Sequence, residues 1–262
     1  MKEFIVNNAK LPIAALTLAG GVALYGPAST EDFVPVHAVA GAPTKTDRIN
    51  LQKDIMSDLP GLGKFTARGN VGPLTLRGLC AERWLTGGTA TRSRSQLTKA
   101  EVNSLVNNDN LISPFVPELG KSLKDGVVIN ETCQVGAVIR GSKVDRVFPV
   151  ATGTKGNDTP NVVTKVTWGR RGMHDSTKYP SEDGNGNMEN PLYFKSHSSI
   201  AIHGGPTSTK PLSRGCIRVP SPESVRLYQE AGGPADSPID KPVGLARPTT
   251  MVVTGAYEYN PR

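Results

Sequence analysis

Short β-branched runs dominate the second half of the chain. Each is bounded by glycine, asparagine, lysine or aspartate, and they cover residues 127–129, 135–139, 144–150, 162–168 and 249–254. Runs of this length and composition predict strands. Residues 169–192 lack periodicity and predict a long loop, after which residues 199–203 return to the strand pattern. We therefore expect a mainly β domain with one or two short helices over residues 125–255.

The first half of the chain predicts helices instead. One apolar face at helical spacing contains Leu76, Leu79, Cys80 and Trp84. Thr98 and Glu101 have the spacing of a capping box, which predicts that another helix begins there. We expect a small helical module over residues 54–110, preceded by an irregular linker over residues 29–53. A module of this size buries little surface alone and should pack on another element.

The N-terminal segment has the pattern of an export signal. Lys2 and Lys10 precede an apolar run over residues 11–25, and small residues follow it. A membrane span needs roughly 20 apolar residues, so this run is short for one. Residues 1–28 are predicted to be a signal peptide or an uncleaved anchor that contacts the membrane. Either reading predicts an exported protein of the bacterial cell envelope, in the cell wall or periplasmic space.

The formal net charge of +7 and the sequence pI of about 9.4 suit an anionic partner. No block of lysine and arginine is interleaved with aromatic residues, so we expect no nucleic-acid partner. A cell-wall polymer rich in carboxylates fits the charge, and so does a solvated basic surface without any partner. We expect a monomer.

The chain has three cysteines, Cys80, Cys133 and Cys216. In an exported protein two of them can pair and leave one free. If Cys216 is reactive, Cys80 and Cys133 are either a disulfide or two buried thiols, and both possibilities stay open. The sequence has no CxxC or HxxxH pair, so we expect neither a metal nor another cofactor.

A histidine and a cysteine carry the candidate chemistry. His203 ends an apolar strand, and twelve residues rich in glycine, proline and serine separate it from Cys216. A thiol reacts as the thiolate, and a neighbouring histidine can take its proton. The charges of Arg214 and Arg218 favour the thiolate, and Arg218 could alternatively bind a substrate carboxylate. The N–H groups of Gly215 and Cys216 could bind an oxyanion.

These residues resemble the signature of YkuD-type L,D-transpeptidase catalytic domains. The signature is His-Gly, a variable loop, then Ser/Thr-His-Gly-Cys, an apolar residue and Arg or Asn; this chain has His203-Gly204 and Ser213-Arg214-Gly215-Cys216-Ile217-Arg218. Gly126–Gly153 and Asn190–Phe194 extend the resemblance over residues 125–255. The helical module loosely resembles small peptidoglycan-binding modules through residues 69–75.

The resemblance implies a β-sandwich and a mechanism. Cys216 would attack a diaminopimelate carbonyl of a peptidoglycan stem peptide, D-Ala would leave, and the side-chain amine of a second stem would form a 3→3 cross-link. His203 would take the thiol proton and later assist the amine. The carbonyl of Gly204 would orient the imidazole, and Ser213 would hold the loop or contact substrate.

Three alternatives remain at this point. An L,D-carboxypeptidase would use the same acyl-enzyme with water as acceptor. A degenerate cell-wall-binding protein is favoured by Arg214, which stands where the family usually has histidine and cannot act as a base. A sortase lacks this spacing. Of the other histidines, His37 lies in the leader or linker, His174 is expected to be exposed, and His197 could line the cleft.

Overall fold

A computed structural model describes residues 41–94, 97–108 and 110–259, which belong to one compact unit. The predicted signal peptide or anchor at 1–28 lies outside the described residues, as does the start of the predicted linker. Within the described ranges, no helix combines the length and apolar character that crossing a membrane requires.

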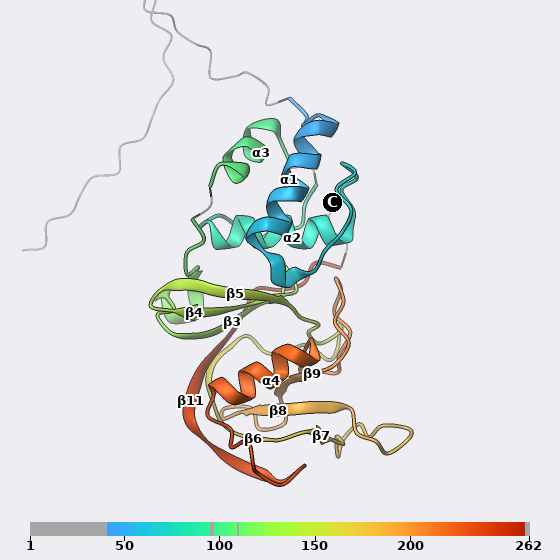
Figure 1. Ribbon diagram of the computed structural model, residues 1–262, viewed down its shortest axis with the longest axis vertical. Coiled ribbons are helices and arrows are strands. Elements are labelled where there is room, and N and C mark those ends of the chain that lie inside the picture. The colour runs from blue at the N-terminus through green and yellow to red at the C-terminus, as the bar shows by residue number, and fades with distance from the viewer. Residues whose placement is uncertain (1–40, 95–96, 109, 260–262) are drawn as a thin grey trace, which may run out of the picture. The chain divides into compact units, whose positions relative to one another are not determined.

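The helical module begins earlier than predicted, at Lys45, and its described residues form four short helices (Figure 1). They are α1 (Lys45–Asp58), the 3-10 helix η1 (Pro60–Leu62), α2 (Pro73–Leu85) and α3 (Lys99–Val106). The linker prediction is wrong over residues 45–53, because these are helical. A complete capping box starts α1: Thr44 Oγ1 accepts from Asp47 N at 3.2 Å, and Asp47 Oδ2 accepts from Thr44 N at 2.8 Å.

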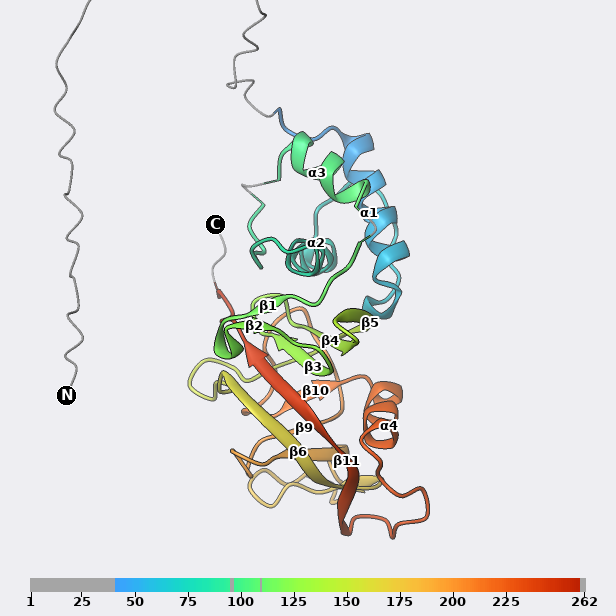
Figure 2. The ribbon, with the colours of Figure 1, turned by 90° about the vertical axis from the view of Figure 1, so that its left-hand side faces the viewer.

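Helix α2 is the centre of this module, and every residue from Thr75 to Leu85 is buried. In Figure 1 it lies between α3 and the strands below, and Figure 2 shows it end-on with α3 above it and α1 alongside. Leu79 packs with Leu51 of α1 and Val102 of α3. On the opposite side, Trp84 packs with strand residues such as Ile139. The module therefore buries its apolar surface against the sheet, as its small size predicts.

A disulfide joins Cys80 in α2 to Cys133, whose Cα atom lies 5.3 Å away, and excludes the alternative of two free thiols there. Helix α3 begins as its sequence indicates, because Thr98 Oγ1 accepts from Glu101 N at 3.1 Å. The Glu101 carboxylate binds Arg83 Nε at 2.6 Å, so the side chain of Glu101 connects α3 to α2.

Most of the regular elements after α3 are strands, which confirms the mainly β prediction with its few short helices. A small ladder pairs β1 (Phe115–Val116) and β2 (Lys121–Ser122) around η2 (Pro117–Leu119). The main sheet has nine strands: β3 (Gly126–Asn130), β4 (Val135–Arg140), β5 (Lys143–Pro149), β6 (Val162–Arg170), β7 (Met173–His174), β8 (Met188–Phe194), β9 (Ala201–Gly204), β10 (Ile217–Val219) and β11 (Pro242–Thr254).

The strand order is β10-β9-β8-β6-β11-β3-β4-β5, with β7 paired to β8. Figure 2 shows β6 beside the long β11 in the middle of this order. The two end strands also approach each other, because Ala151, just after β5, pairs with Arg218 of β10. The curved sheet thus surrounds a core to which both ends contribute, including Phe148 and Ile217. Helix α4 (Ser221–Glu230) packs against β8 and β9 and adds Leu227.

Strand β8 corrects the sequence-based prediction of a loop over residues 169–192, because it begins at Met188. Its start is irregular: Asn190 has a φ of +45° and the pairing with β9 shifts register between Glu189 and Leu192. Pro191 has no N–H to donate to a ladder. Asn-Pro is a turn signal in sequence, so the start of this strand is predicted as a loop, whereas in the structure these residues form a bulge within the strand.

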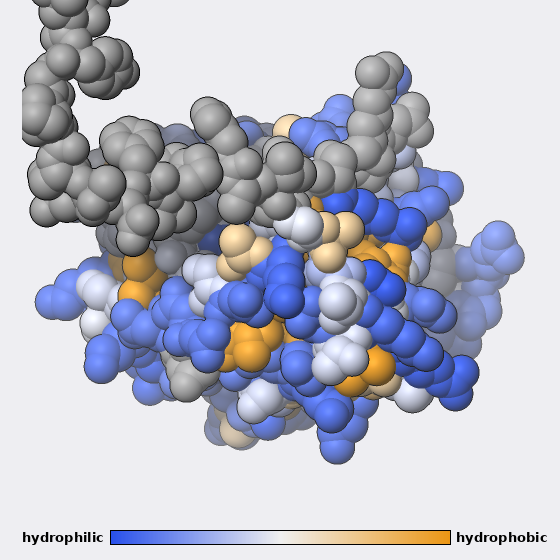
Figure 3. All heavy atoms as spheres, turned by 90° about the horizontal axis from the view of Figure 1, so that it is seen from above, coloured by the Kyte–Doolittle hydropathy of each residue, from blue (hydrophilic) through white to orange (hydrophobic). Residues whose placement is uncertain are grey.

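The surface over the helical module is mainly hydrophilic. Seen from above, the part not covered by grey atoms has small apolar groups separated by polar residues (Figure 3). Scattered apolar residues of this kind are normal on a protein surface.

The disulfide should contribute substantially to stability. In the chain-entropy model a bridge between residues 53 positions apart stabilises the fold by about 4 kcal/mol. We expect the Cys80→Ala, Cys133→Ala double variant to lose about this free energy of unfolding in urea denaturation. Reductant should destabilise the wild type and leave the double variant unchanged. Equal stability of both proteins without reductant would contradict the prediction.

Candidate active site

The parallel pairing of β9 and β10 brings the motif residues together. His203 and Arg218 are direct partners in this register. The side chains of His203 and Arg218 therefore lie on the same face of the sheet. Cys216 precedes Arg218 by two positions, and because side chains alternate along a strand, its side chain is on this face as well. All three side chains line one pocket with a volume of about 490 Å³. The loop between the strands therefore folds back as its glycines and prolines allow.

The segment after β5 is hydrogen-bonded to the loop between β9 and β10 (residues 205–216, the cysteine loop). Ala151 and Arg218 exchange two backbone hydrogen bonds of 3.0 Å, and Thr154 N donates to Ser213 O at 3.0 Å. Thr159 Oγ1 accepts from Gly153 N at 2.8 Å and donates to Gly215 O at 2.9 Å. The sequence contains no local signal for this role of Thr159, because its partner is 56 positions away.

Ser213 stabilises the turn before the cysteine. Its hydroxyl accepts from Gly215 N at 3.1 Å and donates to the carbonyl oxygen of Cys216. Gly215 has a φ of +116°, a conformation that favours glycine. In this conformation the Gly215 N–H donates a hydrogen bond to Ser213 Oγ, which leaves the Cys216 N–H as the other predicted oxyanion donor. The buried Ser213 holds the loop.

His203 is 4% exposed, and its Nδ1 lies 2.9 Å from Gly204 O. A carbonyl can only accept, so Nδ1 carries the proton and Nε2 keeps its lone pair. Burial lowers the pKa of His203 to about 4, the bond to Gly204 opposes this, and the charges of Arg218 and His174 lower it further. At neutral pH the imidazole is therefore an uncharged proton acceptor.

Cys216 is half-buried beside Met188, Tyr193 and Trp168, and the last two rings stack with centroids 4.0 Å apart. Burial raises the pKa of the Cys216 thiol above its ordinary value, while the Ala201 N–H and the Arg218 guanidinium lower it in part. Desolvation is the larger effect. The resting site therefore holds a neutral thiol and a neutral imidazole.

Arg214 and Arg218 have different environments. Arg218 lines the pocket and makes no ion pair within the described residues. Arg214 is exposed at the rim, and its guanidinium lies 4.7 Å from the ring centroid of Tyr179. Such a cation–π contact contributes roughly 0.5–1 kcal/mol at exposed sites. This contact connects the loop after β7 to the loop that precedes Cys216. Arg218, by contrast, is the arginine whose charge lowers the pKa of the Cys216 thiol.

The other histidines differ from expectation. His174 is buried, not exposed, because β7 pairs with β8 and places it opposite Met188 in the same pocket. Its Nδ1 lies 2.6 Å from Asp240 Oδ1. His197 is exposed and does not line the pocket. His37 lies outside the described residues. Sequence reasoning missed the pair of His174 and Asp240, which are 66 positions apart.

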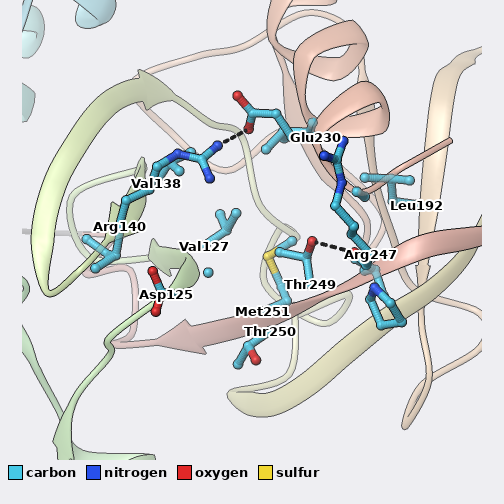
Figure 4. Close-up of a pocket in the computed structure, with 16 residues that line it drawn as sticks. Asp125, Val127, Val138, Arg140, Leu192, Glu230, Arg247, Thr249, Thr250 and Met251 are labelled. Atoms are coloured by element: carbon cyan, nitrogen blue, oxygen red, sulfur yellow. Dashed lines mark hydrogen bonds and ion pairs between the residues drawn. The ribbon is translucent and has the colours of Figure 1, made fainter.

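A second pocket of about 310 Å³ lies where β11 bends near the end of α4 (Figure 4). Arg140 and Glu230 form an ion pair of 3.1 Å at its edge, and Met251 and Val127 line its interior. No cysteine or histidine is among its lining residues. It therefore lacks the nucleophile and base that distinguish the pocket at Cys216.

Comparison with known proteins assigns the segment that contains this site to a family. Residues 124–252 match the sequence profile of the YkuD family, described as the L,D-transpeptidase catalytic domain. This segment is a YkuD-family L,D-transpeptidase domain. The resemblance read from the motif is thereby confirmed, and the match supports a transpeptidase-type enzyme. The matched range is close to the predicted domain at 125–255.

Solved structures of similar proteins include two L,D-transpeptidases. The one from Xylanimonas cellulosilytica DSM 15894, which comprises residues 123–326 of its protein, is 22% identical with a TM-score of 0.46, and the match covers 82% of this chain and 96% of that one. The one from Stackebrandtia nassauensis is 18% identical with a TM-score of 0.44, covering 81% and 93%. No curated protein is a significant sequence match.

The raised pKa of Cys216 predicts slow alkylation at neutral pH. With the disulfide intact, Cys216 is the one thiol of the three cysteines. We expect its reaction with iodoacetamide to be slower than that of free cysteine at pH 7 and to keep rising above pH 9. Arg218→Gln should shift this rise to higher pH, because Arg218 stabilises the thiolate. Arg226→Gln, at an exposed position of α4, is the control. A plateau below pH 8 would contradict the assignment.

Proposed function

We propose that this protein is a peptidoglycan L,D-transpeptidase that forms 3→3 cross-links through an acyl-enzyme on Cys216. The observation that carries the proposal is the shared pocket of Cys216 and the uncharged His203. The YkuD-family match supports the same reaction class. An arginine at position 214 does not remove either reacting group, which argues against a degenerate binding protein.

Acylation begins from the neutral pair. As Cys216 Sγ attacks the donor carbonyl carbon, its proton passes to Nε2 of His203, whose Nδ1 is fixed by Gly204 O. The oxyanion is bound by the N–H of Cys216, since the N–H of Gly215 is engaged by Ser213. His203 then donates the proton to the departing D-Ala amine, so that thioester and free amino acid are the products. Coupling proton transfer to attack avoids a charged pair in a desolvated site.

The charges of the pocket suit a stem-peptide donor. Arg218 offers a guanidinium that pairs with no carboxylate within the described residues, and the exposed Lys178 and Arg214 line the rim. A stem peptide presents carboxylates that these groups can bind, and guanidinium matches a carboxylate in two-point geometry. The formal net charge of +7 favours the same anionic polymer over longer distances.

The proposal extends to location and to the helical module. An enzyme with this substrate acts outside the cytoplasm, which agrees with the export pattern of residues 1–28 and with the disulfide at Cys80. We propose export to the cell envelope, either after cleavage of this segment or with it retained as an anchor. Peptidoglycan binding by the module at 54–110 is part of the same proposal.

Acylation by a carbapenem tests the nucleophile and base. We expect intact-protein mass spectrometry to detect one adduct, absent from Cys216→Ala. His203→Gln should slow adduct formation by about 10²–10⁴-fold, the usual contribution of a general base. In the wild type the rate should decline with acid only near the His203 pKa of about 4, because protonation then removes the base. His197→Gln is the exposed control. A folded wild type without adduct would refute the proposal.

Product analysis separates transfer from hydrolysis. Purified protein with disaccharide-tetrapeptide should yield 3→3 dimers and free D-Ala, detected by mass spectrometry, and Cys216→Ala should yield neither. Dimers would identify a transpeptidase. Tripeptide monomers alone would identify the carboxypeptidase alternative and contradict the cross-linking part of the proposal.

A further inference from the structure

A second imidazole lies in the reaction pocket. His174 lines it together with His203 and Cys216, and its side chain is only 11% exposed. Its ring meets that of Tyr193 edge to face, with centroids 6.5 Å apart, and Tyr193 packs beside Cys216. The acylation mechanism above uses His203 and leaves His174 without a role.

His174 is held in one orientation by a carboxylate. Asp240 Oδ1 lies 2.6 Å from its Nδ1, and Arg170 Nη1 lies 3.2 Å from the same oxygen and 2.6 Å from Asp240 O. The backbone of Asp240 is fixed by its N–H, which donates to Arg171 O at 2.9 Å. A carboxylate oxygen can accept a hydrogen bond from Nδ1–H, and in the tautomer with the proton on Nδ1 the Nε2 atom of His174 is left as a proton acceptor.

The second half-reaction requires a proton acceptor other than water. An alkyl amine has a pKa near 10.4, so at neutral pH the acceptor arrives as an ammonium ion without a nucleophilic lone pair. His203 is a weak base because it is buried and faces the charge of Arg218. It is also the group that must return a proton to Cys216 sulfur when the thioester breaks. The second half-reaction therefore needs two separate proton transfers, and the pocket contains two imidazoles that can carry them out.

We propose that His174, positioned by Asp240, is the base that deprotonates the acceptor ammonium, an inference that rests on the proposed transpeptidase function. Nε2 of His174 takes one proton from the ammonium, and the amine nitrogen forms a bond to the thioester carbon. The carbon–sulfur bond breaks, a second nitrogen proton passes through His203 to sulfur, and the product is an amide with a free thiol. His174 releases its proton to solvent.

Single turnovers on preformed acyl-enzyme test the inference. The donor is disaccharide-tetrapeptide, and the acceptors are disaccharide-tripeptide or hydroxylamine, an amine that is unprotonated at neutral pH. We expect His174→Gln to lower the rate of transfer to the peptide amine at least about tenfold relative to acylation, since a general base contributes roughly 10²–10⁴-fold. Transfer to hydroxylamine should be much less affected. Asp240→Asn should show the same selective loss to a smaller degree, and His197→Gln should show none.

The pH dependence of the transfer rates distinguishes a base from a merely structural role of His174. The groups facing His174 are Asp240, Arg170, Tyr193 and His203. As pH rises toward the pKa of the amine, the free amine no longer needs a base, and the gap between His174→Gln and wild type should close. A gap independent of pH, or equal losses with both acceptors, would overturn the inference. If the wild type forms no acyl-enzyme at all, the proposed function fails first, which is a separate outcome.

Discussion

The strand β10 is the constraint on which the site depends. It is three residues long, yet it is hydrogen-bonded on both sides, to β9 in parallel register and to Ala151 across the seam of the curved sheet. Neither contact alone would hold so short a strand, because fixing each residue costs about 1–2 kcal/mol of backbone entropy. Together they place Cys216 beside His203 and close the sheet around its core. The loop that carries Cys216 is therefore held by the hydrogen bonds that close the sheet.

Burial decides the charge state of the site. It lowers the pKa of His203 and raises that of Cys216, so desolvation opposes an ion pair from both sides. Arg218 favours the thiolate but disfavours the imidazolium, and its net effect does not reverse this balance. A site of this kind keeps the Cys216 thiol protonated at rest. In the proposed mechanism, charge therefore develops only when a carbonyl is in place to receive the attack.

The helical module shows which helices the local sequence pattern predicts and which it does not. The apolar face around Leu79 and the cap at Thr98 predict α2 and α3, because helix formation there follows from spacing and from a side chain three residues away. Helix α1 was missed because it contributes few apolar residues to the core and lies in a polar stretch. Its stability comes from a capping box and from contacts such as Gln52 Nε2 with Asn70 O at 2.9 Å. Such contacts produce no periodic pattern of apolar residues in the sequence.

By itself, the sequence determined the mainly β class, the family of the domain and the candidate pair His203 and Cys216. These follow from residue alternation and from a motif confined to a few positions, so no knowledge of distant contacts is needed. Three features are visible only in the tertiary structure. Cys133 forms a disulfide and is not a free thiol, the Gly215 N–H donates to Ser213, and His174 lies against Asp240. The physical reason is that contacts between distant positions depend on the order in which the strands pair, which the hydrophobic pattern of a single strand does not specify.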